Sequence, residues 1–281
     1  MIAALLLPLI LALPAQAPEA RPSAKADAAM AKARAEEMRE LARGITMKSG
    51  DEKALELAPE PIYRFVDPTR SFSDGTVWAF GRDGRPEAVL TVSLEGRQGG
   101  KLHWLYEFTS LSTDRVRAVG PAGAARWPWA PEGPGIVLRA IPKADAPDAD
   151  APKRLRQMRE LARRFRAYEF FEPKPGERPE RYELRLLPQP VARYKDPASG
   201  LVDGGLFFLV YGQNPEIALV IEARAAGNAA PSWTYGVQRI SAARSHVRLD
   251  DREIADMPRI NDNDLTRPYA GFIRPIPEAV K

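Results

Sequence analysis

The chain has 281 residues, with 41 Lys and Arg against 37 Asp and Glu, so its formal net charge is only +4. It contains no cysteine, which excludes disulfides, thiolate nucleophiles and thiolate metal sites. The charges are mixed along the whole chain, and no basic block accompanies a stacking-aromatic motif, so the composition argues against a nucleic-acid partner.

Residues 1–17 are predicted to form a cleavable signal peptide. An apolar run at 2–13 is followed by AQA, the small-x-small pattern that signal peptidase accepts. The run is shorter than the about 20 residues that span a bilayer. We therefore expect cleavage after Ala17, a periplasmic or secreted protein, and no integral membrane span after cleavage. Residues 18–27 are expected to be a disordered N-terminal segment.

Two stretches of the chain read as copies of each other. A shift of 129 places 59–112 on 188–241 without a gap and gives 13 identical pairs in 54 positions. Roughly three identities are expected by chance. Upstream, the hexapeptide MRELAR occurs at both 38–43 and 158–163. These matches predict an internal duplication.

The predicted fold class is α+β, with two tandem homologous units at 28–142 and 153–277. Each unit is expected to be a helix packed on a mainly antiparallel sheet of four to five strands. An Ala/Asp/Pro-rich segment at 143–152 has no apolar period and is interpreted as a linker. In the second unit, apolar residues recur at helical spacing from 155 to 165.

Beyond each helix the apolar period falls to two, which is typical of strands. The segments DGTVWAFG and DGGLFFLVYG are apolar on both faces, as expected of strands covered on both sides. Both copies keep a Trp-x-Tyr face in the strand that follows, at Trp104 and Tyr106 and at Trp233 and Tyr235. That face is expected to be core.

The helix of the second unit is rich in arginine, with Arg163, Arg164 and Arg166 near its expected end. A basic amphipathic helix can rest on an anionic surface. The corresponding helix of the first unit is nearly balanced in charge. This difference favours a packing helix with a variable solvent-facing side.

Charged residues near the expected turns are kept in both units. They are Arg64, Asp67 and Asp74 in the first unit and Arg193, Asp196 and Asp203 in the second. One interpretation is a twinned binding site in which each arginine grips an anionic group. The interpretation that we favour is structural, since Asp-Pro and Asp-Gly pairs form turns and each arginine can bond to the Asp that follows it.

A Trp/Pro-rich loop, ARWPWAPEGPG, occurs in the first unit only. Exposed, its Trp127 and Trp129 would suit stacking on a glycan or contact with a protein partner. Buried, they would cover the sheet, and this is the interpretation that we favour.

No motif of a known catalytic or metal centre is present. The two histidines, His103 and His246, do not occupy matching positions, and GxSxG, HExxH, Walker and GxGxxG patterns are absent. The Asn/Asp run at 261–264 lacks the spacing of a calcium-binding loop. We therefore assign no catalytic residue, no metal site and no cofactor.

The run ELRLLPQP…DP…DG followed by a Trp-x-Tyr strand resembles uncharacterised exported proteins of planctomycete-type bacteria, mainly across the second unit. The resemblance implies no activity. Together with the predicted export signal, it favours a non-catalytic binding or scaffold protein of the cell envelope. Its partner would be an envelope protein, a glycan or an apolar small molecule.

Two alternative functions remain open at this point. The first is a carrier whose cavity, between curved sheets, would be lined by Trp78, Phe80, Phe207 and Leu209. The second is a carboxylate-dependent hydrolase that would use the aspartates kept in each unit.

Overall fold

The structure is a computed structural model. It describes residues 24–67, 72–81, 84–96, 102–119, 128–172, 176–225, 227, 229–262 and 264–276. The predicted signal peptide lies outside these ranges. Strands account for 50% of the structure and helices for 14%. The predicted α+β class is therefore wrong, because the protein is mostly β, with α1 (Ala24–Arg43) and α2 (Ala151–Ala162) as the α-helices of the described residues.

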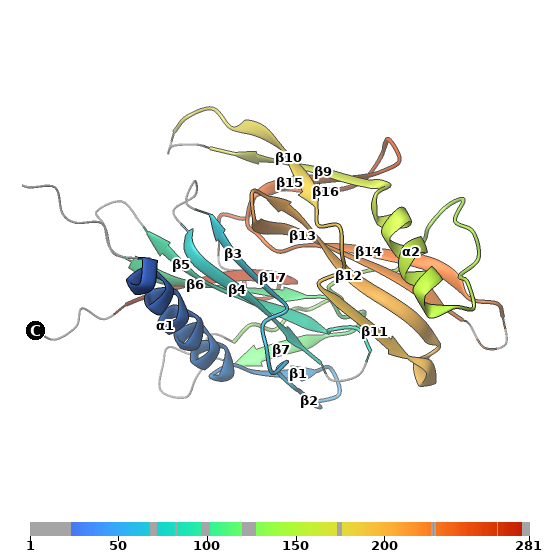
Figure 1. Cartoon of the computed structure of the whole chain (residues 1–281), viewed down its shortest axis with the longest axis horizontal. Coiled ribbons are helices and arrows are strands. Elements are labelled where there is room, and N and C mark those ends of the chain that lie inside the picture. Colours follow the sequence, from blue (N-terminus) through green and yellow to red (C-terminus); the bar gives the residue numbers. More distant parts are fainter. Residues whose placement is uncertain are drawn as a thin grey trace, which may run out of the picture.

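The first sheet has the strand order β17-β6-β5-β4-β3, and all neighbours are antiparallel (Figure 1). Its strands are β3 (Tyr63–Asp67), β4 (Phe72–Phe80), β5 (Ala88–Gly96), β6 (Leu102–Ser110) and β17 (Tyr269–Pro275). A three-stranded sheet of order β2-β1-β7 lies beside it and consists of β1 (Thr46–Ser49), β2 (Ala54–Leu55) and β7 (Val116–Val119).

The second sheet is curled and has nine strands in the order β16-β15-β9-β10-β12-β13-β14-β8, with β11 also paired to β12. Its strands are β8 (Arg139–Ala140), β9 (Phe165–Phe171), β10 (Glu180–Leu186), β11 (Ala192–Asp196), β12 (Leu201–Tyr211), β13 (Asn214–Arg224), β14 (Ser232–Arg239), β15 (Arg244–Leu249) and β16 (Arg252–Met257). A short 3-10 helix, Pro197–Ser199, joins β11 to β12.

Each of the two large sheets includes one strand from the other half of the chain, β17 in the first sheet and β8 in the second. β8 precedes α2 in the chain, yet it pairs with β14 through Ala140 and Thr234. β17 is the last strand of the described residues and pairs with β6, from Tyr269 opposite Thr109 to Pro275 opposite His103. The prediction that each unit is a helix on its own sheet is therefore wrong, whereas the unit boundaries at 28–142 and 153–277 stay a prediction. Hydrophobic periodicity identifies a strand but does not specify which strand it pairs with.

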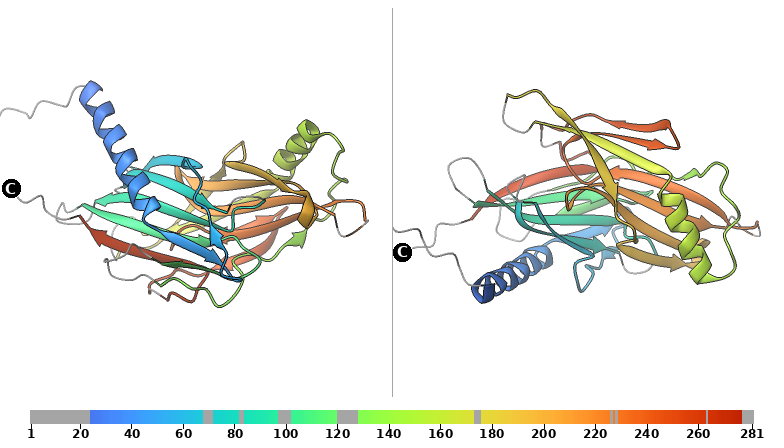
Figure 2. Two further views of the ribbon diagram at one scale, coloured as in Figure 1. Left: turned by 90° about the horizontal axis from the view of Figure 1, so that it is seen from below. Right: turned by 45° about the horizontal axis from the view of Figure 1, so that its top comes forward.

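Three hydrophobic cores follow from this arrangement. The two large sheets face each other across a shared core that includes Val77 and Val89 from the first sheet and Phe208 and Val220 from the second. The other face of each sheet packs against one helix and against shorter or curled strands (Figure 2). Both faces of the central strands are thus buried, which explains why β4 and β12 are apolar on both sides.

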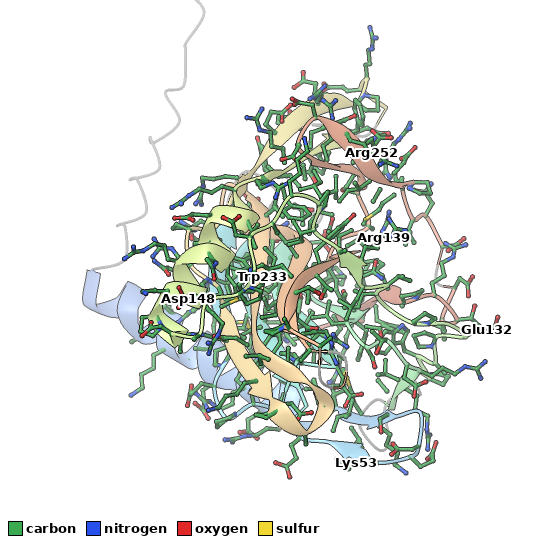
Figure 3. All side chains as sticks on the ribbon, turned by 90° about the vertical axis from the view of Figure 1, so that its right-hand side faces the viewer. Lys53, Glu132, Arg139, Asp148, Trp233 and Arg252 are labelled. Atoms are coloured by element: carbon green, nitrogen blue, oxygen red, sulfur yellow. The ribbon has the colours of Figure 1, made fainter. Side chains whose placement is uncertain are left out.

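The Trp-x-Tyr faces are confirmed as core. Trp104 and Tyr106 belong to the outer core of the first sheet, and Trp233 and Tyr235 to that of the second. In Figure 3 Trp233 lies inside the molecule, whereas the labelled Arg252 lies at its edge.

Gly75 and Gly204 are strand residues and not turn residues, so the turn role expected for the two Asp-Gly pairs is wrong. Gly75 lies directly opposite Phe65, and Gly204 directly opposite Tyr194. A Cβ at either glycine would lie 2.4 Å from a ring carbon of the facing aromatic residue. An aromatic ring that covers a strand glycine leaves no room for any other residue.

Local chemistry explains where α2 begins. The Asp150 carboxylate caps the helix by accepting a hydrogen bond from the backbone N–H of Lys153 at 3.0 Å. Pro152 follows in the first turn, where its missing N–H costs nothing. Met158, Leu161 and Ala162 then bury one face of the helix against the second sheet. Neither helix of the described residues is long and apolar enough to cross a membrane.

Candidate functional site

Arg64 and Asp74 lie on adjacent strands and form a bidentate ion pair. Arg64 Nε and Nη2 donate to the two carboxylate oxygens of Asp74 at 3.0 and 2.6 Å. Nη2 also donates to the carbonyl oxygen of Ala31 in α1 at 2.9 Å. The Asp74 carboxylate raises the pKa of Arg64 because its hydrogen bonds stabilise the charged guanidinium. The pair thus fastens α1 to the edge of the first sheet.

Arg193 and Asp203 repeat this arrangement on the second sheet. Arg193 Nε and Nη2 donate to Asp203 at 2.9 and 2.6 Å, and Nη2 donates to the carbonyl oxygen of Ala151 in α2 at 2.7 Å. Arg154 of α2 adds a further bond to Asp203 at 3.0 Å. A concavity of about 340 Å³ adjoins these residues, and Lys195 also lines it.

The two ion pairs do not form a common site. They lie on different sheets and bind different helices, which are well separated in Figures 1 and 2. Each aspartate is nearly inaccessible, with 3% of the Asp74 side chain and 5% of the Asp203 side chain exposed. The geometry is that of a structural fastening between helix and sheet.

The other predicted site residues are also placed within the fold. Asp67 is buried at the end of β3, and Asp196 is half-buried at the end of β11. Trp129 is fully buried, packs against Phe108 with ring centroids 5.5 Å apart, and donates its indole N–H to the carbonyl of Arg267 at 2.9 Å. Trp129 therefore covers the core and is not accessible to a ligand. Trp127 lies outside the described residues.

The acidic run near the last strand is neutralised by its own neighbours. Arg267 binds Asp262 at 2.9 Å and Asp264 at 3.1 Å, and Asp264 also accepts hydrogen bonds from the backbone and hydroxyl of Thr266. Across the part of the chain that the structure describes, no group of three or more His, Asp or Glu side chains is placed to hold a metal ion.

The side chains expected to line an apolar cavity lie in separate cores. Trp78 and Phe80 belong to the outer core of the first sheet, whereas Phe207 and Leu209 belong to that of the second. All four are almost completely buried, and they do not line one common space. The carboxylates that a hydrolase would use at 74 and 203 are already bound by arginine.

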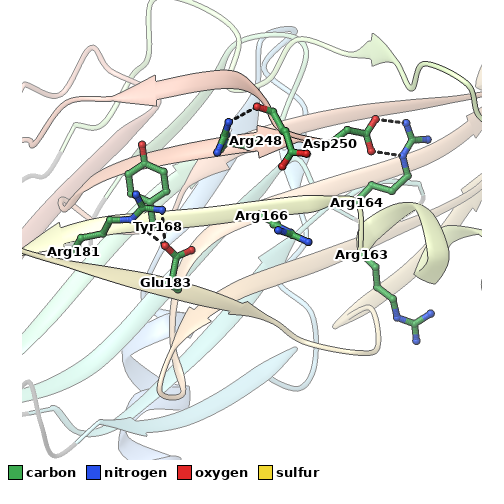
Figure 4. A pocket seen from close by; sticks show the side chains of 9 residues that line it. Arg163, Arg164, Arg166, Tyr168, Arg181, Glu183, Arg248 and Asp250 are labelled. Carbon is green, nitrogen blue, oxygen red and sulfur yellow. Dashed lines mark hydrogen bonds and ion pairs between the residues drawn. The ribbon is translucent and has the colours of Figure 1, made fainter.

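A different concavity, the arginine pocket, lies where β9, β10 and β15 meet (Figure 4). Its volume is about 480 Å³. Five arginines and three acidic residues line it together with one tyrosine, so the lining has an excess of positive charge. The lining residues are Arg163, Arg164, Arg166, Tyr168, Arg181, Glu183, Arg248, Asp250 and Asp251.

Arg164 closes one side of the arginine pocket. Its Nε and Nη2 donate to the two carboxylate oxygens of Asp250 at 2.9 and 2.6 Å, and Nη2 also donates to the carbonyl of Pro142 at 2.8 Å. These hydrogen bonds raise the pKa of Arg164 and lower that of Asp250, since they stabilise both charged forms. The pair is a fixed wall of the pocket.

Arg181 closes the opposite side, as Figure 4 shows. It donates to Glu183 Oε1 at 2.9 and 2.5 Å, and its guanidinium carbon lies 3.7 Å from the centre of the Tyr168 ring. The Tyr168 ring is also stacked on His246, with centroids 4.7 Å apart and an angle of 10° between the planes. The guanidinium, phenol and imidazole thus form a continuous stack.

The remaining arginines have no acidic partner. Arg163 and Arg166 form no side-chain hydrogen bond or ion pair within the described residues. Within the same part of the chain, Arg248 donates to the backbone carbonyl of Asp251 and to no side chain. Arg166 and Arg248 lie directly opposite each other on β9 and β15, a position in which like charges repel. A bound anion would relieve this repulsion, and a guanidinium matches an oxyanion by bidentate hydrogen bonding.

Sequence reasoning missed this pocket because it placed Arg163, Arg164 and Arg166 on the helix. The helix ends at Ala162, and β9 starts at Phe165 with alternating buried and exposed side chains. Arg166 therefore points to the exposed side of a strand. The available signal was the alternation of Phe165, Arg166 and Ala167, which has the period of a strand.

The first half of the chain has the same strand pairing with different outward side chains. Thr46 on β1 faces Val119 on β7. The shift of 120 that aligns the two MRELAR segments takes Thr46 to Arg166, and the shift of 129 takes Val119 to Arg248. These two arginines also face each other, on β9 and β15. The charged side chains of the three-stranded sheet pair internally. Lys48 binds Glu52 at 3.3 Å, and Arg117 Nε binds the same carboxylate at 2.8 Å.

Comparisons of the chain with models of protein families, with curated proteins and with solved structures find no match.

Proposed function

We propose that the protein is a non-catalytic binding protein of the cell envelope that takes an anionic ligand in the arginine pocket. The observation that carries this proposal is the presence of three arginines, Arg163, Arg166 and Arg248, that line one concavity without an acidic partner. Its location outside the cytoplasm rests on the signal peptide predicted from residues 1–17.

The charge balance of the pocket supports an anionic ligand. Opposed guanidinium groups on neighbouring strands cost stability in the free protein. A ligand oxyanion that accepts hydrogen bonds from both removes this repulsion, and charge-assisted bonds of this kind are about twice as strong as neutral ones. The cost of keeping the arginines together is thus offset when the ligand binds.

The state of the carboxylates supports a non-catalytic role. Asp250 and Glu183 in the pocket are bound by Arg164 and Arg181. The hydrogen bonds from Arg164 lower the pKa of Asp250, which makes this carboxylate a poor general acid. The pocket therefore offers recognition by guanidinium groups.

The proposal can be tested by retention on a dextran-sulfate column. The variant Arg166→Thr/Arg248→Val places in the pocket the residues that β1 and β7 carry at the corresponding positions. A matched control, Lys48→Thr/Arg117→Thr, removes the same charge from the three-stranded sheet. We expect the pocket variant to elute at clearly lower salt and the control to elute near the unmodified protein. Equal losses in both variants would show that the column senses only net charge and would overturn the proposal.

A further inference from the structure

The arginine pocket offers no free aromatic face. Tyr168 is covered by the Arg181 guanidinium at 3.7 Å and by the His246 ring at 4.7 Å. Two groups this close to one ring must lie on opposite faces of it. Phe170, the next aromatic residue along the exposed side of β9, makes edge contacts with both Tyr168 and His246. All these rings serve contacts within the protein.

This arrangement distinguishes between classes of anionic ligand. Proteins that bind single-stranded nucleic acid stack its bases on exposed aromatic side chains. Carbohydrate binding by an aromatic platform likewise needs an accessible ring face. Neither is offered here, so the ligand is recognised through its charged group and not through a ring.

The positions of the arginines indicate the shape of that charged group. Arg166 and Arg248 occupy directly opposed positions on adjacent strands, so their guanidinium groups can reach the same small anion from two sides. Arg163 also lines the pocket. Two guanidinium groups that approach one anion suit a ligand with several terminal oxygens, since each guanidinium can pair with two of them.

The charge of the lining indicates the charge of the ligand. With five arginines against Glu183, Asp250 and Asp251, the pocket carries two more positive than negative charges. A singly charged carboxylate or phosphodiester would leave one positive charge uncompensated, whereas a dianion neutralises the lining. A phosphate monoester has nearly two negative charges at neutral pH, and it has three terminal oxygens.

We infer that the arginine pocket binds a phosphate monoester or inorganic phosphate, with the dianion bridging Arg166 and Arg248. This inference rests on the proposed function and specifies its ligand. The phosphate can come from a soluble molecule or from the headgroup of a lipid, and the chemistry of recognition is the same in both cases.

Isothermal titration calorimetry at pH 8 tests the inference with three probes: inorganic phosphate, dimethyl phosphate and acetate. We expect inorganic phosphate to bind at least about tenfold more tightly than the two monoanions. The variant Arg166→Lys/Arg248→Lys keeps the charge but loses the bidentate geometry, and we expect it to bind phosphate at least about fivefold more weakly. Circular dichroism on each variant checks that the sheet is intact.

Co-sedimentation with vesicles separates the two sources of phosphate. Binding to vesicles with phosphatidic acid but not to vesicles with phosphatidylglycerol would support a lipid headgroup with a terminal phosphate. Binding of inorganic phosphate without vesicle binding would support a soluble ligand.

Two results would overturn the inference. One is equal affinity for inorganic phosphate, dimethyl phosphate and acetate. The other is tighter binding of an oligothymidine, a single-stranded polyanion of phosphodiesters, than of inorganic phosphate. Either result leaves the proposed function intact if dextran-sulfate retention still depends on Arg166 and Arg248, so the two failures are distinguishable.

Discussion

The three-stranded sheet β2-β1-β7 and the strands β10-β9-β15 use the same pairing and carry different surfaces. Met47 faces Leu55 in the first, and Ala167 faces Leu184 in the second. These inward residues are buried in both. The outward side chains of the first set pair with each other around Glu52, whereas those of the second leave guanidinium groups without acidic partners.

This difference shows which residues the fold constrains. Strand register is fixed by the buried side, because a slip of one residue would move every apolar side chain to the solvent. The exposed side carries no such constraint and can change its charge at little cost in stability. A binding surface can therefore arise on one set of strands while the other set remains structural.

The largest effect on stability is expected from breaking the Arg–Asp pair of either half. Asp203 binds two guanidinium groups, those of Arg193 and Arg154, whereas Asp74 is held by the guanidinium group of Arg64. Because a buried ion pair that loses one partner leaves the other uncompensated, we expect Asp203→Ala to lower the free energy of unfolding by about 2–4 kcal/mol. Asp74→Ala should cost less.

Urea denaturation of the two alanine variants measures this difference. Equal losses for Asp74→Ala and Asp203→Ala would contradict the idea that the second arginine makes the Asp203 site the more costly one to break.

A smaller effect, dependent on pH, is expected at Glu107. Its counterpart at a shift of 129 is Gly236, so only the first sheet carries this carboxyl group. Burial raises the pKa of Glu107 from 4.5 to about 7, although the Tyr269 hydroxyl donates a hydrogen bond to it at 2.6 Å. The folded protein therefore binds this proton more tightly than the unfolded chain does, and stability falls as the pH rises from about 4.5 to about 7.

Glu107→Gln should remove this dependence and raise the free energy of unfolding at pH 8 by about 1–3 kcal/mol. Thermal unfolding between pH 4 and pH 9 measures it. A variant that keeps the full pH dependence of the unmodified protein would show that another group is responsible.

The smallest effect on stability is expected at the wall of the arginine pocket. Asp250 is exposed and has a φ of 44°, a conformation that asparagine tolerates well. Asp250→Asn should therefore change the melting temperature only slightly. It also releases Arg164 from its carboxylate partner, so phosphate affinity should rise by about two- to fivefold. Unchanged affinity in calorimetry would mean that Arg164 does not contribute to the site.

Much of the secondary structure was accessible from the sequence. The segments predicted to be strands with two apolar faces coincide with β4 and β12, and the Trp-x-Tyr faces on β6 and β14 are buried as predicted. Burial of Trp129 was also expected from the sequence. These predictions depend on local pattern alone, since a strand with both faces covered shows an unbroken apolar run wherever its partners lie in the chain.

The fold class and the candidate site were not accessible in the same way. The sequence identifies β8 and β17 at most as short apolar segments and does not specify that each pairs with the sheet of the other half. The arginine pocket is formed by residues from 163 to 251, which come together because β9 pairs with both β10 and β15. Arg64 and Arg193 stood out because both halves keep them, and in the structure they fasten helices to sheets.

The exchange of β8 and β17 has a consequence for biosynthesis. A ribosome releases β3, β4, β5 and β6 long before it reaches residue 275, where β17 ends. Until then the backbone amides and carbonyls along one side of β6 lack a partner strand and can pair with a wrong one. The first sheet is thus complete only after β17 has been made, and a pairing between strands this far apart in the sequence makes folding slow.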